Sequence, residues 1–424
     1  MIAPRGFSGT DQPKASIYDA CIRCGLCLPS CPTYLETMTE TSGPRGRISL
    51  IKSVAQGQLD LLSAGFVHQM NECLDCRACE AVCPSGVAYG QLLETARAQI
   101  LRAQEPAQSS GARMTQRLMR ALFGRPELMR AAARILRFAQ QARLLWVAKL
   151  VGLGTAVKLA PPISASFFAV AGQRVEASDP QGLAMLHAGC IMPVAFASVH
   201  EATLRMLCRG GLSVTVPAEQ GCCGAIAVHA GDRDFARALA KRNIAAFEKS
   251  GADVYVVNAA GCGSALREYG ELFAGDSEWS GRAERFSARV RDVTEVLDAL
   301  DLGSPSRSVD ATATYQQPCH LVHAQRVARA PRRLLSKIPG LRLVEMDESD
   351  LCCGSAGIYN LTQPEMASRL QQRKVRAIER TGATVVVTAN PGCAIQVAVG
   401  LRDAGYRAGV KHVVELLDEA FNDA

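Results

Sequence analysis

The pattern of apolar positions divides the chain into a helical first part and a second part in which short apolar runs alternate with helices. Between residues 111 and 150, Leu, Met, Phe and Ile recur at the spacing of an amphipathic helix. Beyond residue 182 the apolar runs are short enough for buried strands. They lie at 183–187, 253–257, 311–316 and 384–388. Strands that alternate with helices form parallel sheets, so we expect an α+β multidomain protein with two small parallel sheets.

The amphipathic stretch 111–150 is strongly basic. It holds nine basic residues against Glu127 alone, so it carries a formal charge of +8 in a chain whose total is +7. We predict helices with a break near Gly124–Pro126, and three roles stay open: a linker packed on its own domains, a contact with an anionic membrane surface, or a contact with an acidic partner. Nucleic acid is not expected, because no helix-turn-helix or zinc-finger pattern accompanies the stretch. The basic residues are Arg113, Arg117, Arg120, Arg125, Arg130, Arg134, Arg137, Arg143 and Lys149.

Composition narrows the class of protein. The chain has 424 residues, 48% of them apolar and 21% charged, so it is neither disordered nor a small disulfide scaffold. The amino-terminal residues lack the apolar centre of a secretory signal, and no apolar run is long enough for a spanning helix. We therefore expect a cytoplasmic protein whose 17 cysteines serve metal or redox chemistry rather than disulfides.

Eight of the cysteines fall into two runs with one spacing. Each run follows Cys-x2-Cys-x2-Cys-x3-Cys-Pro, over residues 21–32 and 73–84. This is the spacing of bacterial ferredoxins, in which three thiolates of a run bind one [4Fe-4S] cluster and the fourth binds the other cluster. Zinc is the alternative, but zinc sites favour paired Cys-x2-Cys knuckles. We predict that the first cluster takes Cys21, Cys24, Cys27 and Cys83, and that the second takes Cys73, Cys76, Cys79 and Cys31.

The segment between the two runs predicts a turn at Ser42–Gly43 followed by a helix. We therefore expect a helical ferredoxin module, with helices between and after the cysteine loops. Arg45 and Arg47 fall in this segment. They can lie against a cluster and raise its potential, bind a neighbouring subunit, or stay in solvent.

A second group of eight cysteines belongs to an internal repeat. Each copy has one Cys after a predicted strand, then a Cys-Cys-Gly turn, then a Cys after the next strand, at spacings that agree within one residue. We expect the four cysteines of a copy to meet on the loops at the carboxyl ends of its strands. The first copy has Cys190, Cys222, Cys223 and Cys262, and the second has Cys319, Cys352, Cys353 and Cys393.

The sequence leaves open what this second group binds. Four thiols can hold a third iron-sulfur cluster or a zinc ion, or they can be structural thiols or the remnant of a site. A disulfide between the adjacent Cys222 and Cys223 is not expected, because it would be strained. His187 and His320 lie close to cysteines of the repeat, where each can tune a cluster, bind metal, handle protons or have no special role. His229 has no role that the sequence supports.

The order of these features resembles the iron-sulfur subunit of bacterial glycolate oxidase over essentially the whole chain. The segments most similar to that family are Cys-Ile-Arg-Cys-Gly-Leu-Cys-Leu-Pro-Ser-Cys-Pro-Thr-Tyr from residue 21, Ser-Gly-Pro-Arg-Gly-Arg-Ile from residue 42 and Cys-Leu-Asp-Cys-Arg-Ala-Cys-Glu from residue 73. A ferredoxin module with two CCG (cysteine-rich) domains is also similar to the small subunit of anaerobic glycerol-3-phosphate dehydrogenase, to lactate-utilisation proteins and to heterodisulfide reductase.

The resemblance implies an electron-transfer subunit of an oxidoreductase complex. In that family, separate FAD-binding subunits oxidise the 2-hydroxy acid, and the subunit that this chain resembles passes electrons towards the quinone pool. The chain has no Gly-x-Gly-x-x-Gly loop after a strand and no flavin signature, so we expect no catalytic residue for the hydroxy acid on it. We expect peripheral contact with the inner face of the cytoplasmic membrane through 111–150. The alternatives are a lactate or glycerol-3-phosphate dehydrogenase subunit, or an enzyme acting at a CCG site.

One departure bears on the last alternative. A CCG domain of heterodisulfide reductase ends in Cys-x2-Cys, whereas Ala259 and Asn390 stand three residues before the last cysteines here. Each copy offers four thiols rather than five, which argues against a noncubane cluster and disulfide reduction.

The chain therefore divides into four predicted parts. The helical ferredoxin module spans 1–110, the basic linker 111–182, the first CCG domain 183–305 and the second 306–424.

Overall fold

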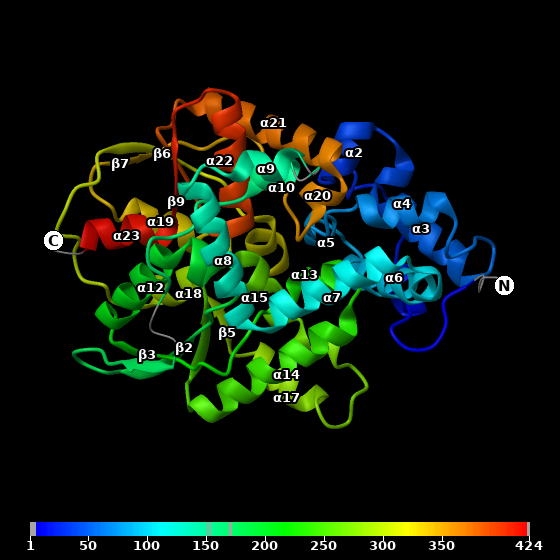
Figure 1. The fold of residues 1–424 in the computed structure, drawn as a ribbon, viewed down its shortest axis with the longest axis horizontal. Helices are drawn as coiled ribbons and strands as arrows, with labels where there is room; N and C mark the ends of the chain where they lie inside the picture. The colour runs from blue at the N-terminus through cyan, green and yellow to red at the C-terminus, as the bar shows by residue number, and fades with distance from the viewer. Residues whose placement is uncertain (1–5, 151, 153, 169–171, 422–424) are drawn as a thin grey trace.

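The computed structural model describes residues 6–150, 152, 154–168 and 172–421. The amino-terminal helices, blue in Figure 1, lie at one end of the molecule, and the two repeats, green and yellow to red, lie beside each other. The α+β class with two small sheets after a helical part is confirmed. Residues 1–5 and 422–424 and the side chain of Lys149 are outside the described part of the chain. The predicted boundaries at residues 110, 182 and 305 stay predictions.

The amino-terminal module consists of helices packed around two cysteine loops. Pro32 and Pro44 each stand at the first position of a helix, where proline's missing N–H breaks no hydrogen bond. The helix predicted after Ser42 is confirmed as α3, and α6 is buried along most of its length. The helices are α1 (Ala15–Tyr18), α2 (Pro32–Thr37), α3 (Pro44–Ala55), α4 (Ala64–Glu72), α5 (Ala78–Ala81) and α6 (Tyr89–Gln104).

The basic stretch and the residues that follow it form helices that bridge the two repeats. The predicted break is confirmed, because α7 (Ser110–Gly124) and α8 (Pro126–Gln141) are separated by an extended Arg125. They are followed by α9 (Leu145–Leu150) and α10 (Gly154–Leu159). An ion pair of 2.7 Å joins Arg120 of α7 to Asp232 in the first repeat, and one of 2.6 Å joins Lys158 of α10 to Asp403 in the second. None of the helices in the described ranges combines the length and apolar character needed to cross a bilayer.

The first repeat contains a five-stranded sheet in the order β1-β3-β2-β4-β5. The predicted strands 183–187 and 253–257 are confirmed as β2 (Gly182–Leu186) and β4 (Val254–Val257), which pair in parallel. The sheet also holds β3 (Leu212–Val216) and β5 (Val290–Asp292). β1 (Gln173–Val175) was not expected in a helical segment; it adds an antiparallel edge strand on β3, so this sheet is not wholly parallel.

The helices of the first repeat lie between and after its strands in the chain. They are α11 (Met192–Ala195), α12 (Ala197–Arg209), α13 (Ala225–His229), α14 (Arg233–Ser250), α15 (Ala260–Arg267), α16 (Tyr269–Leu272), α17 (Ser280–Ser287) and α18 (Val293–Ala299).

The second repeat contains a four-stranded parallel sheet in the order β7-β6-β8-β9. The predicted strands are confirmed as β6 (Ala311–Tyr315) and β8 (Val385–Thr388), with β7 (Leu341–Leu343) and β9 (Gly409–His412) at the edges. A π-helical segment, His320–Ala324, follows Cys319. The helices are α19 (Ala330–Ser336), α20 (Tyr359–Thr362), α21 (Pro364–Thr381), α22 (Pro391–Asp403) and α23 (Val413–Phe421).

The two repeats exchange their last helices. α23, the last helix of the second repeat, packs on α12 of the first, and α18, the last helix of the first, packs on α19 of the second. A bidentate pair between Arg205 and Asp418 joins α12 to α23. A single apolar core accordingly contains Leu207 of the first repeat together with Leu334 and Leu417 of the second. The exchange fuses the repeats into one packed body.

Candidate metal centres

The first predicted quartet is brought together at the end of the amino-terminal module. Cys21, Cys24 and Cys27 line one small cavity with Cys83 from the second run. Cys79 reaches the same cavity. Cys24 is exposed and the other three are partly buried, so one edge of this quartet meets solvent. The local backbone curls because Gly25 has a φ of +85°, which a residue with a Cβ rarely adopts.

The second predicted quartet is buried deeper in the same module. Cys31, Cys73, Cys76 and Cys79 are all buried, and the charges of Cys31 and Cys73 act on both Cys76 and Cys79. Burial raises the pKa of the Cys76 and Cys79 thiols well above its usual range. A thiol in such a place ionises when a cation binds it, so these side chains are suited to hold a metal rather than to act as free nucleophiles.

Hydrogen-bond donors surround the sulfur atoms of the second quartet. The amide of Asp75 donates to Cys73 Sγ at 3.4 Å, and the Tyr89 hydroxyl donates to the same sulfur at 3.6 Å. Thr33 Oγ1 lies 3.3 Å from Cys31 Sγ, but its hydroxyl donates to the Ser42 carbonyl at 2.6 Å and not to the sulfur. Donors to thiolate sulfur stabilise negative charge, which is one way in which a protein raises the reduction potential of a cluster.

The two arginines between the cysteine runs have different places. Arg45 is half-exposed; it pairs with Glu40 and donates to the Arg23 carbonyl at 3.0 Å, so it lies against the loop of the first quartet. Arg47 is fully buried and donates to Glu72 at 2.9 Å, close to the second quartet. The solvated alternative is therefore wrong for Arg47. An effect of either arginine on potential stays a prediction.

The first repeat gathers its four thiols at the carboxyl ends of β2 and β4. Each thiol of Cys190, Cys222, Cys223 and Cys262 is within hydrogen-bonding reach of the next one. Gly224, which ends the Cys-Cys-Gly turn, has a φ of +83°, and its counterpart Gly354 has +88°. That left-handed backbone explains why glycine completes the motif in both copies.

His187 joins this first-repeat quartet. A ring nitrogen of His187 and the sulfur atoms of Cys223 and Cys262 lie within 4.8 Å of one another. His187 Nδ1 is 2.8 Å from the Tyr255 hydroxyl, which fixes the ring and leaves Nε2 for the thiols. A hydrogen bond with Cys223 and the nearby His187 lower the pKa of Cys262 to about 6. The site therefore offers five donors.

The second repeat has different neighbours around its quartet. A hydrogen bond with Cys352 and burial raise the pKa of the Cys319 thiol. The pKa values of Cys352 and Cys353 are raised as well: one thiol hydrogen bond of each lowers the pKa, but a second thiol hydrogen bond and burial outweigh it. In place of a histidine, the position three residues before Cys319 is Gln316, which bonds to Thr388 and not to a thiol. The buried ammonium of Lys374 supplies positive charge to Cys352 and Cys353. The Asn390 side chain donates to Cys393 Sγ at 3.4 Å.

The second predicted quartet adjoins the second repeat. Cys76 packs in one buried cluster with Cys319 and Cys352, and the charge of Cys319 is the largest that acts on the Cys76 thiol. His320 Nε2 donates to the Asp75 carbonyl at 2.9 Å, and the Tyr359 hydroxyl donates to the Glu72 carbonyl at 2.7 Å. The ferredoxin module and the second repeat therefore meet at their thiols.

A cavity of about 360 Å³ separates the thiols of the two repeats. Asn390 bridges the repeats here, because its Oδ1 accepts from the Gly261 amide at 3.0 Å. The walls are mostly apolar, and six of the repeat cysteines line them. These are Cys190, Cys222, Cys223, Cys262, Cys319 and Cys393.

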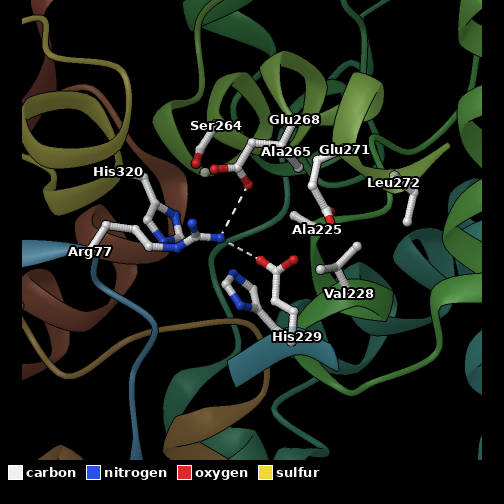
Figure 2. A pocket seen from close by; sticks show the side chains of 12 residues that line it. Arg77, Ala225, Val228, His229, Ser264, Ala265, Glu268, Glu271, Leu272 and His320 are labelled. Atoms are coloured by element: carbon white, nitrogen blue, oxygen red, sulfur yellow. Dashed lines mark hydrogen bonds and ion pairs between the residues drawn. The ribbon is translucent and has the colours of Figure 1, made fainter. Parts of the chain in front are cut away.

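His229 and His320 separate this cavity from a second, polar pocket. Their rings stack with centroids 5.3 Å apart, and both residues line both spaces. Figure 2 shows the polar pocket, where Arg77 points towards Glu268 and lies close to His320 and His229. Although burial alone would raise it, Arg77 and His229 hold the pKa of Asp75 well below its usual range. Asp75 Oδ2 lies 3.2 Å from His229 Nδ1.

The thiols fit iron-sulfur clusters by their chemistry. All 17 cysteines, each within the described residues, are free thiols, and sixteen of them stand in four groups of four. The remaining one, Cys208, packs against the core of the first repeat. Two of the groups have the spacing in which three thiols and a crossed fourth hold a cubane cluster. In the structure, Cys83 stands with the first run and Cys31 with the second, which is compatible with that crossing.

Comparisons with known proteins identify both parts of the chain. Residues 17–87 match the model of the 4Fe-4S dicluster domain, and residues 184–267 and 313–398 each match the model of the cysteine-rich domain. The probable glycolate oxidase iron-sulfur subunit of Bacillus subtilis (strain 168) is 38% identical over 94% of this chain and 93% of its own length. The glycolate oxidase iron-sulfur subunit of Escherichia coli (strain K12) is 33% identical over 96% and 94%. Lactate utilization protein A of an Exiguobacterium strain is 31% identical over 55% of this chain and 96% of its own.

Proposed function

The chain belongs to the family of glycolate oxidase iron-sulfur subunits, and on that premise we propose that it carries electrons from glycolate, oxidised on an FAD-binding partner subunit, to a quinone. It is an iron-sulfur electron-transfer subunit of a 2-hydroxy acid oxidase complex. Glycolate as the donor, FAD on the partner and quinone as the acceptor are the parts that we propose.

The observation that carries the proposal is the continuous series of thiol groups. The exposed quartet at Cys24 adjoins the buried quartet at Cys76, since Cys79 reaches the cavity of the first. Cys76 in turn packs against Cys319 and Cys352 of the second repeat. A series of this kind leads from the surface to the centre of the molecule, as an electron relay requires.

We assign one [4Fe-4S] cluster to Cys21, Cys24, Cys27 and Cys83, and another to Cys73, Cys76, Cys79 and Cys31. A cluster bound there would take up and release one electron at a time. The chain's own residues set the environment. Arg47 is buried near the second quartet, and Arg45 stands at the edge of the first, where solvent screens its charge.

The exposed edge at Cys24 is the face on which we place the electron-donating partner. Ile22 and Leu26, which flank Cys24, are 68% and 59% exposed, and Val82 beside Cys83 is 43% exposed. Apolar side chains around the only exposed thiol of the four quartets, all of which lie in the described part of the chain, fit a protein surface that brings a flavin close.

For the two repeat quartets we favour iron-sulfur clusters over zinc. The contact between Cys76 and Cys319 puts the second-repeat quartet in line with the ferredoxin module. Zinc has no redox chemistry and would end the electron path there. Iron and zinc analysis of the purified complex, with Cys223→Ser and Cys353→Ser variants, tests this assignment.

Helices α7–α9 supply the membrane-facing surface in our proposal. On α8, Ile135 and Phe138 are 71% and 64% exposed, and they lie on one face with Leu128. Trp146 on α9 is also exposed, and indoles favour the interface of a bilayer. Arginines border these side chains, so an apolar strip with a basic border matches an anionic lipid surface.

Charge reversal tests the membrane contact. We expect that Arg130→Glu, Arg134→Glu and Arg137→Glu together release the purified complex from vesicles that contain anionic lipid. The loss should be at least tenfold in the partition coefficient, because each basic residue near such a surface contributes about 1 kcal/mol. Arg285→Glu, Arg289→Glu and Arg291→Glu in the first repeat form the control. Binding that stays equal in both triple variants would contradict a contact through α8.

Anaerobic purification of the complex tests the function itself. An FAD-bearing partner should co-purify, and glycolate should bleach the iron-sulfur absorbance. Bleaching by lactate or glycerol-3-phosphate alone would keep the relay and replace the donor. A chain that purifies without a flavoprotein and is reduced by none of these donors would contradict the proposal.

The crossed ligation has its own test. Cys31→Ser should perturb the same electron paramagnetic resonance signal as Cys76→Ser, and Cys83→Ser the same signal as Cys24→Ser. Cys208→Ser is the matched control, because that thiol lies outside all four quartets. If Cys31→Ser perturbs the signal that Cys24→Ser perturbs, each run holds its own cluster and the crossing is wrong.

A further inference from the structure

We propose that the cavity between the repeats binds the ring of a quinone and that His229 gives a proton to one of its oxygen atoms. This rests on the proposed function, because it locates the site at which the complex would hand electrons to its acceptor. The argument uses the walls of the cavity, its thiols, the two histidines and the polar pocket behind them.

The cavity has the size and the walls that a quinone ring needs. Its volume of about 360 Å³ lies within the range of small-molecule sites, which are mostly apolar with a few placed polar groups. The clusters that we assign to the repeat thiols would take the part of this space next to the cysteines, and the quinone ring would lie against the apolar walls. The apolar walls come from both repeats and from the linker helices. They include Phe123, Leu159, Met192, Ile226, Ile358 and Ile395.

Thiols of both repeats open onto this cavity. Cys190 and Cys262 line it from the first repeat, and Cys319 and Cys393 line it from the second. Cys319 also belongs to the buried cluster with Cys76. An acceptor in the cavity therefore lies at the inner end of the thiol series, beside the last groups that the series reaches.

The two histidines at the inner wall have different hydrogen-bonding roles. His320 Nε2 donates to the Asp75 carbonyl at 2.9 Å, so the proton on this nitrogen is held in a backbone hydrogen bond and is not free for transfer. His229 Nδ1 faces the Asp75 carboxylate at 3.2 Å, which leaves Nε2 of the ring without a protein partner in the described structure. Asp75 is thus a positioning residue, and stacking on His320 fixes the plane of the His229 ring. With Nδ1–H donating to the Asp75 carboxylate, the proton that can be transferred is the one that Nε2 carries when the ring is doubly protonated.

The polar pocket on the other side of the histidines supplies protons. Glu268 and Glu271 line it with His229, and Glu268 is ion-paired to Arg77 at 3.2 Å (Figure 2). The side chain of Glu268 is 37% exposed, so it meets solvent. These carboxyl groups open the pocket to water, and water is the source from which Nε2 of the ring is protonated again after each transfer.

The linker helices lead from the membrane-facing surface to the cavity. Phe123 of α7 and Leu159 of α10 are part of the cavity wall, and Ile135 and Phe138 of α8 face outwards. Leu361, at the rim, is 48% exposed. The cavity wall therefore includes apolar side chains of the same linker helices that we place against the bilayer.

The reaction balances as a two-electron, two-proton reduction. Oxidation of one 2-hydroxy acid on the flavoprotein releases two electrons, which arrive through the relay one at a time. The quinone takes up both electrons, and its two carbonyl oxygens each form an O–H bond. One proton comes from Nε2 of the protonated His229 ring and is replaced from water, and the other comes from water at the rim. No other bond forms or breaks.

The test compares two acceptors on the purified complex. Ferricyanide accepts electrons from exposed centres, whereas a short-chain ubiquinone needs its own site. We expect the ratio of ubiquinone to ferricyanide turnover to fall roughly 100-fold in His229→Gln, which cannot deliver a proton. Ile226→Trp should lower the same ratio by filling the cavity. Ala274→Phe, on an exposed loop outside the cavity, is the matched control and should keep the ratio of the natural protein.

Photolabelling gives a readout that does not depend on turnover. An azido-ubiquinone should label residues 225–229 or 355–361 in the natural complex, and unlabelled ubiquinone should compete. His229→Gln should keep this labelling, because it alters proton delivery and not the cavity, and Ile226→Trp should lose it. Labelling confined to other segments, or an unchanged turnover ratio in both variants, would overturn the proposal. If no hydroxy acid reduces either acceptor while the cavity is still labelled, the proposed function fails and the quinone site stands.

Discussion

Acidification should loosen the contact between the two repeats, because two buried histidines there are held neutral. His200 Nε2 donates to the Ala188 carbonyl at 2.9 Å, and its Nδ1 faces the Asn258 amide nitrogen at 3.0 Å. His412 Nε2 donates to the Asn258 carbonyl at 3.0 Å, and its Nδ1 accepts from the Val414 amide at 3.1 Å. Each ring has one nitrogen that must stay unprotonated.

The magnitude follows from the pKa shifts. Burial lowers the pKa of His200 to about 3 and that of His412 to about 4. In the unfolded chain both have a pKa of about 6.5. The unfolded state therefore binds protons that the two buried rings of the folded state do not bind. The free energy of unfolding falls as the pH drops below about 6.5. The fall ends near pH 4 for His412 and near pH 3 for His200. Between pH 7.5 and pH 5 the loss is about 2 kcal/mol for each histidine.

Native-state hydrogen exchange measures this loss locally. We expect the opening free energy of amides in β4, β9 and the start of α23 to drop by about 4 kcal/mol from pH 7.5 to pH 5, after correction for intrinsic exchange. His412→Gln cannot titrate and should halve the drop. His68→Gln is the control, because His68 is an exposed histidine of the amino-terminal module. An opening free energy that changes by less than about 0.5 kcal/mol would refute the reasoning.

Three further predictions concern stability, measured as the free energy of unfolding in urea. Arg47→Ala leaves a buried carboxylate without its partner and should cost roughly 3–5 kcal/mol, whereas Arg45→Ala, at an exposed pair, should cost less than about 1 kcal/mol. Gly231→Ala should lower the free energy of unfolding more than Gly251→Ala does. Both glycines have a positive φ, but only at Gly231 would the new Cβ lie 2.6 Å from the backbone of α6. Gly251→Ala should therefore show the left-handed strain alone, about 1–2 kcal/mol. Burial raises the pKa of Asp292 to about 6, so the free energy of unfolding falls as the pH rises from about 4 to 6. Asp292→Asn should remove this pH dependence and raise the free energy of unfolding at pH 8 by up to about 3 kcal/mol.

Local spacing predicts most of the site. The cysteine runs, the Cys-Cys-Gly turns and the strands before them are short-range patterns, and the structure has β2, β4, β6 and β8 within one residue of their predicted bounds. The glycine of each turn shows why, since a φ near +85° is a local requirement that one residue type meets.

The missed features depend on contacts between distant segments. His229 has no pattern around it, and it joins the site only because Asp75 and His320 come from other parts of the fold. Lys374 has the spacing of an ordinary helix residue, yet its ammonium is buried beside Cys353. The short strand β1 carries no apolar run, because its place at the edge of the sheet is set by backbone pairing with β3. A buried charge or an edge strand of this kind cannot be recognised before its partners are known.

The exchanged helices determine the order in which parts of the protein can become buried as the chain is synthesised. α12 ends at Arg209, but α23, the helix that covers it, begins only at Val413. The apolar face of α12 therefore stays uncovered until almost the whole chain has left the ribosome. Cys76 likewise stays accessible until Cys319 and Cys352 have been synthesised and folded over it. In our assignment, iron and sulfide would reach the second quartet before the carboxyl-terminal repeat packs over it. A chain that stops before α23 would therefore leave the first repeat unfinished as well as the second, because the apolar face of α12 would lack the helix that covers it.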